Sequence, residues 1–140
     1  MIIRPAQARD LDACLALDAS YETEYVWQME ISRPEGNRNP RFRETRLPRS
    51  MRVAALPWPR EAALEDYERG ECFLVADENE AILGCLDMTV DRWKRIGWIQ
   101  QLTVSPERRR HGIGGALLRQ ALTWARRESL ITVMAGMQTK

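Results

Sequence analysis

A mixed α/β fold, with a mainly antiparallel sheet flanked by helices, is predicted by three features of this 140-residue sequence. Short β-type runs and helical patterns alternate along the chain. Two apolar runs joined by a polar turn, at residues 73–76 and 82–90, predict a central hairpin. A strand, a turn with glycines and a long helix then lead to a last β-branched run, which predicts one strand-helix-strand crossover. The length and the 44% hydrophobic content predict a single domain over residues 1–140.

The N-terminal part is expected to contain a strand, a helix and an inserted hairpin. The run "MIIRPA" predicts a strand that ends at Pro5, and apolar residues at helical spacing around Leu11 predict a helix. Residues 25–31 and 41–53 read as two extended arms. Glycine, asparagine and proline in residues 33–40 favour a loop between these arms.

The second half is expected to hold a helix, three strands, a long helix and a last strand. Residues 59–70 predict a helix that begins near a proline and stops at Gly70. The run "IGWIQQLTV", residues 96–104, is apolar except at its two glutamines, so we expect a strand covered on both faces. An apolar stripe after Gly114 predicts the long helix, and "LITVMAG" the last strand, beside the strand that ends at Val104.

Charge and composition exclude several classes of protein. Lys plus Arg number 21 against 20 acidic residues, so the net charge of +1 draws the chain neither to nucleic acid nor to an anionic membrane. No apolar run approaches the roughly 20 residues of a membrane-spanning helix, and no signal peptide is evident, so we expect a cytoplasmic protein. The three cysteines form no Cys-x-x-Cys pair and there is one histidine, so we expect buried, reduced thiols and no metal site.

The stretch "LTVSPERRRHGIGGALL" predicts a binding site for phosphate. Glycine lets the backbone adopt unusual dihedral angles and approach another molecule closely. A glycine turn that opens a helix exposes unpaired N–H groups beside the positive end of the helix dipole. Three arginines, Arg108 to Arg110, add local positive charge. From the spacing alone, a turn that needs glycine for steric reasons, with solvated arginines, stays an equal alternative.

Two common phosphate loops do not match these letters. The turn has no Gly-Lys-Ser/Thr ending, and Leu117 stands where a dinucleotide fingerprint has its third glycine. A nucleoside triphosphate and NAD are therefore disfavoured.

The turn and its flanks resemble the GCN5-related N-acetyltransferase (GNAT) family. That family's motif is Arg or Gln, two residues, Gly, one residue, then Gly or Ala, which here spans Arg109 to Gly114. The flanking "LTVSPE" and "GALL", the opening "IIRPAQARDLDACLAL" and the hairpin "FLVADENEAILGCLDM" are also similar to the family. The resemblance covers the chain outside residues 20–58.

The resemblance implies an acetyl-CoA-dependent N-acetyltransferase that acts on an amine acceptor. It implies that backbone amides of the turn hold the pyrophosphate, and that the strand before the turn pairs through its backbone with the pantetheine arm. The implied cofactor-binding residues are Leu102, Thr103, Val104, Arg109, Arg110, His111, Gly112, Ile113, Gly114 and Gly115. A non-catalytic acyl-CoA-binding module is the alternative function.

The sequence departs from the family at two places. Many members have an acidic residue near positions 100 and 101 to deprotonate the amine, whereas this chain has Gln100 and Gln101. Asp87 and Glu24 are candidate substitutes, but we assign no catalytic residue. The family's further helix and two strands after the last strand, with a tyrosine that protonates the leaving thiolate, are not in this sequence. Three explanations stay open: the chain is a fragment, the protein is naturally short, or a second copy supplies the cover. Of these we prefer a homodimer joined at the edge of the last strand.

A segment rich in arginine lies between residues 33 and 52, with seven arginines against two glutamates. Guanidinium groups in such number suit an anionic substrate or a nucleic acid. A solvated hairpin, whose arginine stems cover Trp27, Phe42 or Met51, is the favoured interpretation. Nucleic acid is not an expected partner, because the whole chain is nearly neutral.

Overall fold

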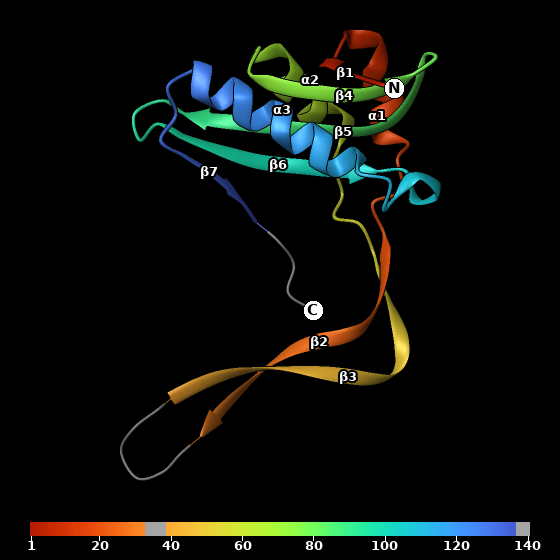
Figure 1. Cartoon of the computed structure of the whole chain (residues 1–140), viewed down its shortest axis with the longest axis vertical. Helices are drawn as coiled ribbons and strands as arrows, with labels where there is room; N and C mark the ends of the chain where they lie inside the picture. Colours follow the sequence, from red (N-terminus) through yellow and green to blue (C-terminus); the bar gives the residue numbers. More distant parts are fainter. Residues whose placement is uncertain (33–38, 137–140) are drawn as a thin grey trace. The chain divides into compact units, whose positions relative to one another are not determined.

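The computed structural model describes residues 1–32 and 39–136, which form two compact units (Figure 1). One unit contains residues 1–19 and 56–136, and the other contains residues 20–55. Most of the loop expected at residues 33–40 lies outside the described residues. No helix in the described part of the chain is long and apolar enough to cross a bilayer.

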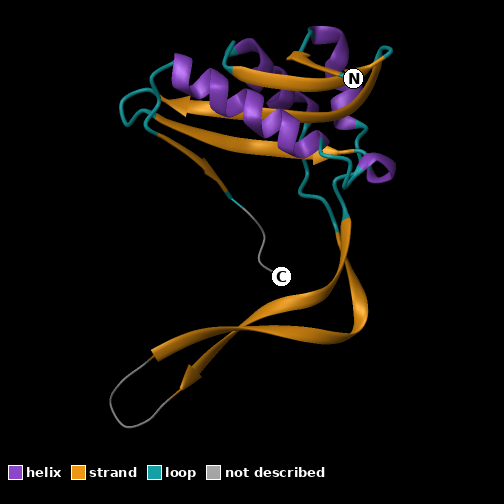
Figure 2. Cartoon of the chain, in the orientation of Figure 1, coloured by secondary structure: helices purple, strands orange, loops and turns teal. Residues whose placement is uncertain are grey.

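The first unit is a five-stranded sheet in the order β1-β4-β5-β6-β7, with helices on both faces (Figure 2). Neighbouring strands are antiparallel except β6 and β7, which are parallel. This confirms the predicted fold class and the predicted crossover through the long helix. The strands are β1 (Ile2–Pro5), β4 (Cys72–Glu78), β5 (Ala81–Asp91), β6 (Ile96–Val104) and β7 (Thr132–Ala135). The helices are η1 (Ala8–Asp10), α1 (Leu11–Leu15), α2 (Arg60–Glu68), η2 (Pro106–Arg108) and α3 (Ile113–Arg127).

The central hairpin turns through two residues, Asn79 and Glu80, whose φ angles of 52° and 68° are both positive. Such a turn matches the twist of the strands that it joins. The N–H of Glu80 donates to the carboxylate of Asp77 at 2.9 Å, which holds the turn. The hairpin is thus confirmed, and each of its strands is longer than the apolar run that predicted it.

Two apolar layers lie on opposite faces of the sheet. Helix α3 packs its buried face, Ile113, Leu117, Ala121 and Ala125, on residues of β4 and β5 such as Leu86 and Met88. On the other face, residues of α1 and α2 pack on Phe73, Val75 and Cys85. Cys14, Cys72 and Cys85 are all free and buried, as expected. Burial raises the pKa of Cys72 to about 12, so this thiol stays protonated at neutral pH.

The expectation that β6 is covered on both faces is wrong. Trp98 and Leu102 keep 39% and 43% of their surface exposed, and Gln100 is exposed as well. The strand is apolar, but the helices pack mainly on β4 and β5, so part of β6 remains open.

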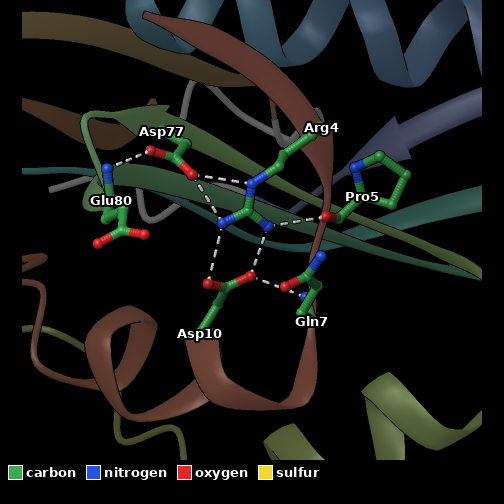
Figure 3. Close-up of polar contacts among 6 residues, drawn as sticks. All are labelled: Arg4, Pro5, Gln7, Asp10, Asp77 and Glu80. Atoms are coloured by element: carbon green, nitrogen blue, oxygen red, sulfur yellow. Dashed lines mark hydrogen bonds and ion pairs between the residues drawn. The ribbon is translucent and has the colours of Figure 1, made fainter.

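Arg4 joins three elements at the opposite edge of the sheet (Figure 3). Its guanidinium donates to both carboxylate oxygens of Asp10, at 2.6 and 3.0 Å, and to Asp77 at 2.9 Å. The N–H of Gln7 adds a bond of 2.7 Å to Asp10. The hydrogen bonds and charge of Arg4 hold the pKa of Asp10 below its usual range. This network fixes β1, η1 and the start of the hairpin turn without touching β6.

The second unit is a two-stranded antiparallel hairpin of β2 (Tyr21–Ser32) and β3 (Asn39–Val53). Arg43 pairs with Glu30 at 3.0 Å and Arg46 with Glu24 at 3.1 Å, so β2 supplies acids to some of the arginines of β3. The predicted hairpin is confirmed. The expected cover of apolar side chains by arginine stems is wrong for Trp27 and Phe42, which are 53% and 68% exposed.

Candidate functional site

The turn between β6 and α3 contains two residues in the left-handed region. Arg110 has φ of 66°, and Gly112, the N-cap of α3, has φ of 81°. Left-handed residues in a turn make neighbouring backbone N–H groups point to a common centre, which favours an anion. A Cβ on Gly112 would meet no atom within 4 Å, so the dihedral angle, not crowding, is the reason within this chain for glycine there.

Helix α3 opens with N–H groups that have no acceptor within the helix. Its first backbone bond runs from the N–H of Ala116 to the carbonyl oxygen of Gly112, at 2.9 Å. The N–H groups of Ile113, Gly114 and Gly115 therefore lie before the first acceptor of the helix. These residues, with Val104 and the arginines of the turn, line an open cavity of about 280 Å³. The structure thus brings the predicted turn residues together around one hollow, except His111, which is not among the residues that line it.

The three arginines of the turn have different surroundings. The Nε of Arg109 donates to the carbonyl oxygen of Val104 at 3.0 Å, and its guanidinium also bonds the carbonyl oxygen of Asp18. Arg108 pairs with Glu78 at 3.2 Å. Arg110 is exposed at the rim of the cavity. Arg109 therefore braces the turn from within, whereas the other two leave charge at the surface.

Strand β6 has an open edge next to this turn. Its partner β7 pairs with Ile96 to Ile99 only. Among the residues that the structure describes, no strand pairs with this edge of β6 from Gln100 to Val104. An unpaired edge presents free N–H and C=O groups, which suits an extended ligand that carries amides.

Alternation along β6 decides which backbone groups face the open edge. Ser105 donates its N–H to the carbonyl oxygen of Leu83 on β5. Leu83 precedes Gly84, which lies opposite Val104. In an antiparallel ladder the backbone groups of successive residues alternate in direction. The groups of Thr103 therefore face β5, and those of Leu102 and Val104 face the open edge. Thr103 lies between the two residues that present their backbones.

A β-bulge in β6 brings both glutamines to one face of the sheet. The register passes from Asp87 opposite Gln101 to Met88 opposite Ile99, so Gln100 is the extra residue. The amide nitrogen of Gln100 donates to the hydroxyl of Thr89 at 3.0 Å. Thr89 and Asp87 are two residues apart on β5 and share a face. Strict alternation would have separated Gln100 from Gln101, and the bulge removes that separation.

Asp87 is one of the two acidic residues that the sequence suggests as substitutes for the missing acid at positions 100 and 101. Its side chain is 1% exposed, and its Oδ2 has no hydrogen-bond partner among the described residues. Burial raises its pKa to about 6, with Arg69 opposing and Glu71 reinforcing that shift. Glu24, the other candidate, lies in the hairpin unit, where it is exposed and paired with Arg46. Asp87 therefore lies on the same face of the sheet as the two glutamines, and its Oδ2 has no hydrogen-bond partner among the described residues.

Trp58, an aromatic residue between the hairpin unit and α2 in the sequence, belongs to the core. Its ring lies 5.7 Å from that of Phe73, and its Nε1 donates to Asp66 at 3.1 Å. Tyr25 and Trp27 are in the hairpin unit and are about half exposed.

The comparisons with known proteins agree with this site and fold. Crystal structures of acetyltransferases superpose on the chain. They include nourseothricin acetyltransferase, with a TM-score of 0.77 and 21% identity over 96% of this chain and 71% of that one. A Bacillus anthracis protein described as a streptothricin acetyltransferase, in complex with acetyl coenzyme A, gives 0.69 and 21% over 96% and 73%. The Escherichia coli ribosomal-protein-S18-alanine N-acetyltransferase gives 0.64 and 13% over 96% and 64%. These identities show a shared fold, and no curated protein matches the chain.

The fold and the turn define an α/β protein of the acyltransferase class. The model of the acetyltransferase (GNAT) family matches residues 38–139, so the chain belongs to the GNAT family. The family confirms the predicted fold class, the N-acetyltransferase class and acetyl-CoA as the cosubstrate.

Proposed function

We propose that this chain holds acetyl-CoA along the open edge of β6 and on the turn before α3, and transfers its acetyl group to an amine. The pyrophosphate is bound by backbone amides from Arg109 to Gly115, at the positive end of the α3 dipole. The pantetheine arm pairs with the outward groups of Leu102 and with the N–H of Val104, on either side of Thr103. The observation that carries this proposal is that the unpaired edge of β6 runs directly into the glycine turn.

Gly114 supports a ligand at the turn. It lies in the first turn of α3, and a Cβ there would meet only one ordinary contact, Val104 Cγ2 at 3.7 Å. Glycine inside a helix costs about 1 kcal/mol relative to alanine. Since no described residue crowds a side chain at this place, the close approach of another molecule is a sufficient reason for glycine.

The open edge also sets where the acetyl group lies. Gln100 and Gln101 precede Val104 by three to four residues, a distance of about 10–13 Å along a strand. A pantetheine arm that runs back along the edge from the turn brings its thioester beside the bulge at Gln100. The acceptor amine then approaches the thioester from the face that carries the two glutamines.

Turnover with a panel of amines tests this function. The purified chain is incubated with acetyl-CoA and one of three amines: nourseothricin, a peptide with N-terminal alanine, or an aminoglycoside. The first two represent the named neighbours. Free CoA thiol is measured against controls without acceptor. We expect release that depends on at least one amine, with the acetylated product seen by mass spectrometry. No turnover by a chain that binds acetyl-CoA contradicts the proposal.

A non-catalytic acyl-CoA-binding module is the second candidate. It is favoured by one observation, the presence of Gln100 and Gln101 where an acid is expected, because an amide cannot serve as a base near neutral pH. Calorimetry with CoA, combined with the turnover assay, distinguishes the two functions. Binding of CoA without turnover supports the module, and the absence of binding contradicts both.

We also propose an assembly and a location for this chain. The chain forms a homodimer through the outer edge of β7, which pairs with no strand among the described residues. It works in the cytoplasm, where its three free cysteines stay reduced.

A further inference from the structure

The carboxylate of Asp87 has a buried position that the stability of the fold does not explain. It is one of the largest fully buried side chains, and its Oδ2 lacks a hydrogen bond among the described residues. An unpartnered polar atom in the interior is destabilising, and few proteins retain one without a use for it. Its strand neighbours on the same face, Cys85 and the facing Phe73, are apolar core residues.

The position of Asp87 relative to the bulge connects it with the acetyl-transfer region. Asp87 lies directly opposite Gln101, at the step where the register shifts around Gln100. Gln100 is exposed, and Gln101 is partly buried and lies opposite the buried Asp87 in the register. The bulge turns both glutamines to the face that Asp87 occupies. A polar path to a spare carboxylate oxygen therefore begins where the proposed site places the thioester.

We propose that Asp87 is the general base of the acetyl transfer, acting on the acceptor ammonium group through one water molecule held by Gln100 and Gln101. This inference rests on the proposed function. The glutamines orient the water and do not take up a proton themselves, whereas the carboxylate does.

The transfer begins when the ammonium group passes one proton through the water to Asp87, which becomes a neutral carboxylic acid. The free amine nitrogen then bonds to the carbonyl carbon of the thioester, and the carbon–sulfur bond breaks to release the CoA thiolate. The nitrogen loses its second proton, which neutralises the thiolate, and Asp87 returns its own proton to solvent. The products are an amide, CoA thiol and one proton.

The charges that face Asp87 agree with such a role. Burial raises its pKa to about 6, close enough to neutral pH for a base to be both ionised and basic. Arg69, after α2, lowers this pKa, and Glu71, before β4, raises it. Glu71 itself accepts the N–H of Val90 at 3.0 Å and lies 4.0 Å from Arg69. The other titratable groups whose charge or pKa is linked to Asp87 are the thiols of Cys72 and Cys85.

The first test is the pH profile of kcat/KM for the wild type and for Asp87→Asn. The acceptor is nourseothricin, or the panel amine that the wild type acetylates fastest. For the wild type, kcat/KM rises as the pH passes through about 6 and then levels off, because the ionised carboxylate is the active form. Asp87→Asn is expected to lose about 100-fold at pH 7. The difference in kcat/KM between this variant and the wild type becomes smaller above pH 9, because the acceptor amine is then deprotonated in solution.

Two further variants move the profile in opposite directions. Arg69→Gln removes a positive charge and is expected to shift the inflection to higher pH. Glu71→Gln removes a negative charge and is expected to shift it to lower pH. Asp91→Asn, at the exposed end of the same strand, is the matched control and leaves the profile unchanged.

Binding and stability show that the variant is folded. Asp87→Asn is expected to bind CoA as the wild type does. It is also expected to be more stable above pH 6, since a raised pKa means that ionisation of Asp87 destabilises the fold as pH rises through it. The proposal is overturned if Asp87→Asn lowers kcat/KM by the same factor at every pH. It is also overturned if neither Arg69→Gln nor Glu71→Gln moves the inflection of the pH profile. Absence of turnover by the wild type overturns the proposed function instead, and the role of Asp87 with it.

Discussion

The Nε of Arg109 donates a hydrogen bond of 3.0 Å to the carbonyl oxygen of Val104, so the first residue of the glycine motif holds the last residue of β6. The same guanidinium bonds the carbonyl oxygen of Asp18, beyond α1. Arg109 therefore fixes the turn to two parts of the fold, and its side chain is engaged with the protein before any phosphate arrives.

Replacement of Arg109 tests this brace. Arg109→Ala is expected to weaken CoA binding by about tenfold, because the amides of the turn lose their fixed positions. Arg109→Lys restores the charge but not the forked set of donors, and so recovers only part of the affinity. Arg92→Ala, which removes a surface ion pair with Glu128, is the control and leaves the affinity within about twofold. Equal effects of Arg109→Ala and Arg92→Ala in calorimetry would contradict the brace.

A proline at Leu102 tests the pairing of the pantetheine arm. The N–H of Leu102 faces the open edge, so its loss removes no bond to β5, and proline is tolerated at an open edge. Leu102→Pro is expected to lower the affinity for acetyl-CoA by about tenfold with little change in thermal stability. Leu102→Ala keeps the N–H and is the control for the half-exposed side chain. If both variants bind equally well, the arm does not pair with this residue.

The Arg4 network gives a prediction about acid stability. Asp10→Ala is expected to lower the free energy of unfolding by about 2 kcal/mol at pH 7, because Arg4 and the N–H of Gln7 lose their acceptor. The pKa of Asp10 is lowered in the folded state, so its contribution is present above its unfolded pKa of about 4 and is lost as the pH falls through the lowered value. Denaturant unfolding at pH 7 and pH 2 measures the difference, which is expected to shrink at pH 2. Asp12→Ala, an exposed partner of Arg60, is the control with little effect at either pH.

The outer edge of β7 gives a prediction about self-association. The N–H of Thr132 faces inward, towards the carbonyl oxygen of Arg95 at 3.5 Å. By alternation, the N–H of Ala135 faces outward, and its side chain is exposed. Ala135→Pro is therefore expected to weaken the dimer while the monomer stays folded. Val133→Lys is expected to lower stability as well, because Val133 packs against the core. A monomer at every concentration in sedimentation, for the parent chain, rules out the proposed dimer.

The sequence predicts most of the fold because its signals are local. Pro5, the hairpin turn, the apolar stripe of α3 and the β-branched last strand each determine an element from a few neighbouring residues. The sequence also points to the turn, because glycines between a strand and a helix have a direct structural meaning. The open edge of β6 is different, since it depends on how far β7 pairs along β6, which no local pattern records.

The face that Gln100 and Gln101 share was also beyond the sequence. Two consecutive residues of a regular strand point to opposite faces, and only the pairing of β5 with β6 shows that Gln100 is a bulge. The sequence leaves the role of Asp87 open for the same reason. Its burial and its unpartnered oxygen arise from packing across the sheet, which no local pattern records.

The most direct measurement of the central claim is calorimetric titration of acetyl-CoA into the wild type and Gly114→Val. The added Cβ meets no close contact among the described residues, with Val104 Cγ2 at 3.7 Å from it, so the variant is expected to fold. Its methyl groups enter the hollow where the pyrophosphate is proposed to lie. The account predicts that the wild type binds acetyl-CoA and that Gly114→Val loses at least about tenfold in affinity with an unchanged or higher melting temperature. Equal binding by the two proteins, with both folded, would show that the cosubstrate does not lie on this turn.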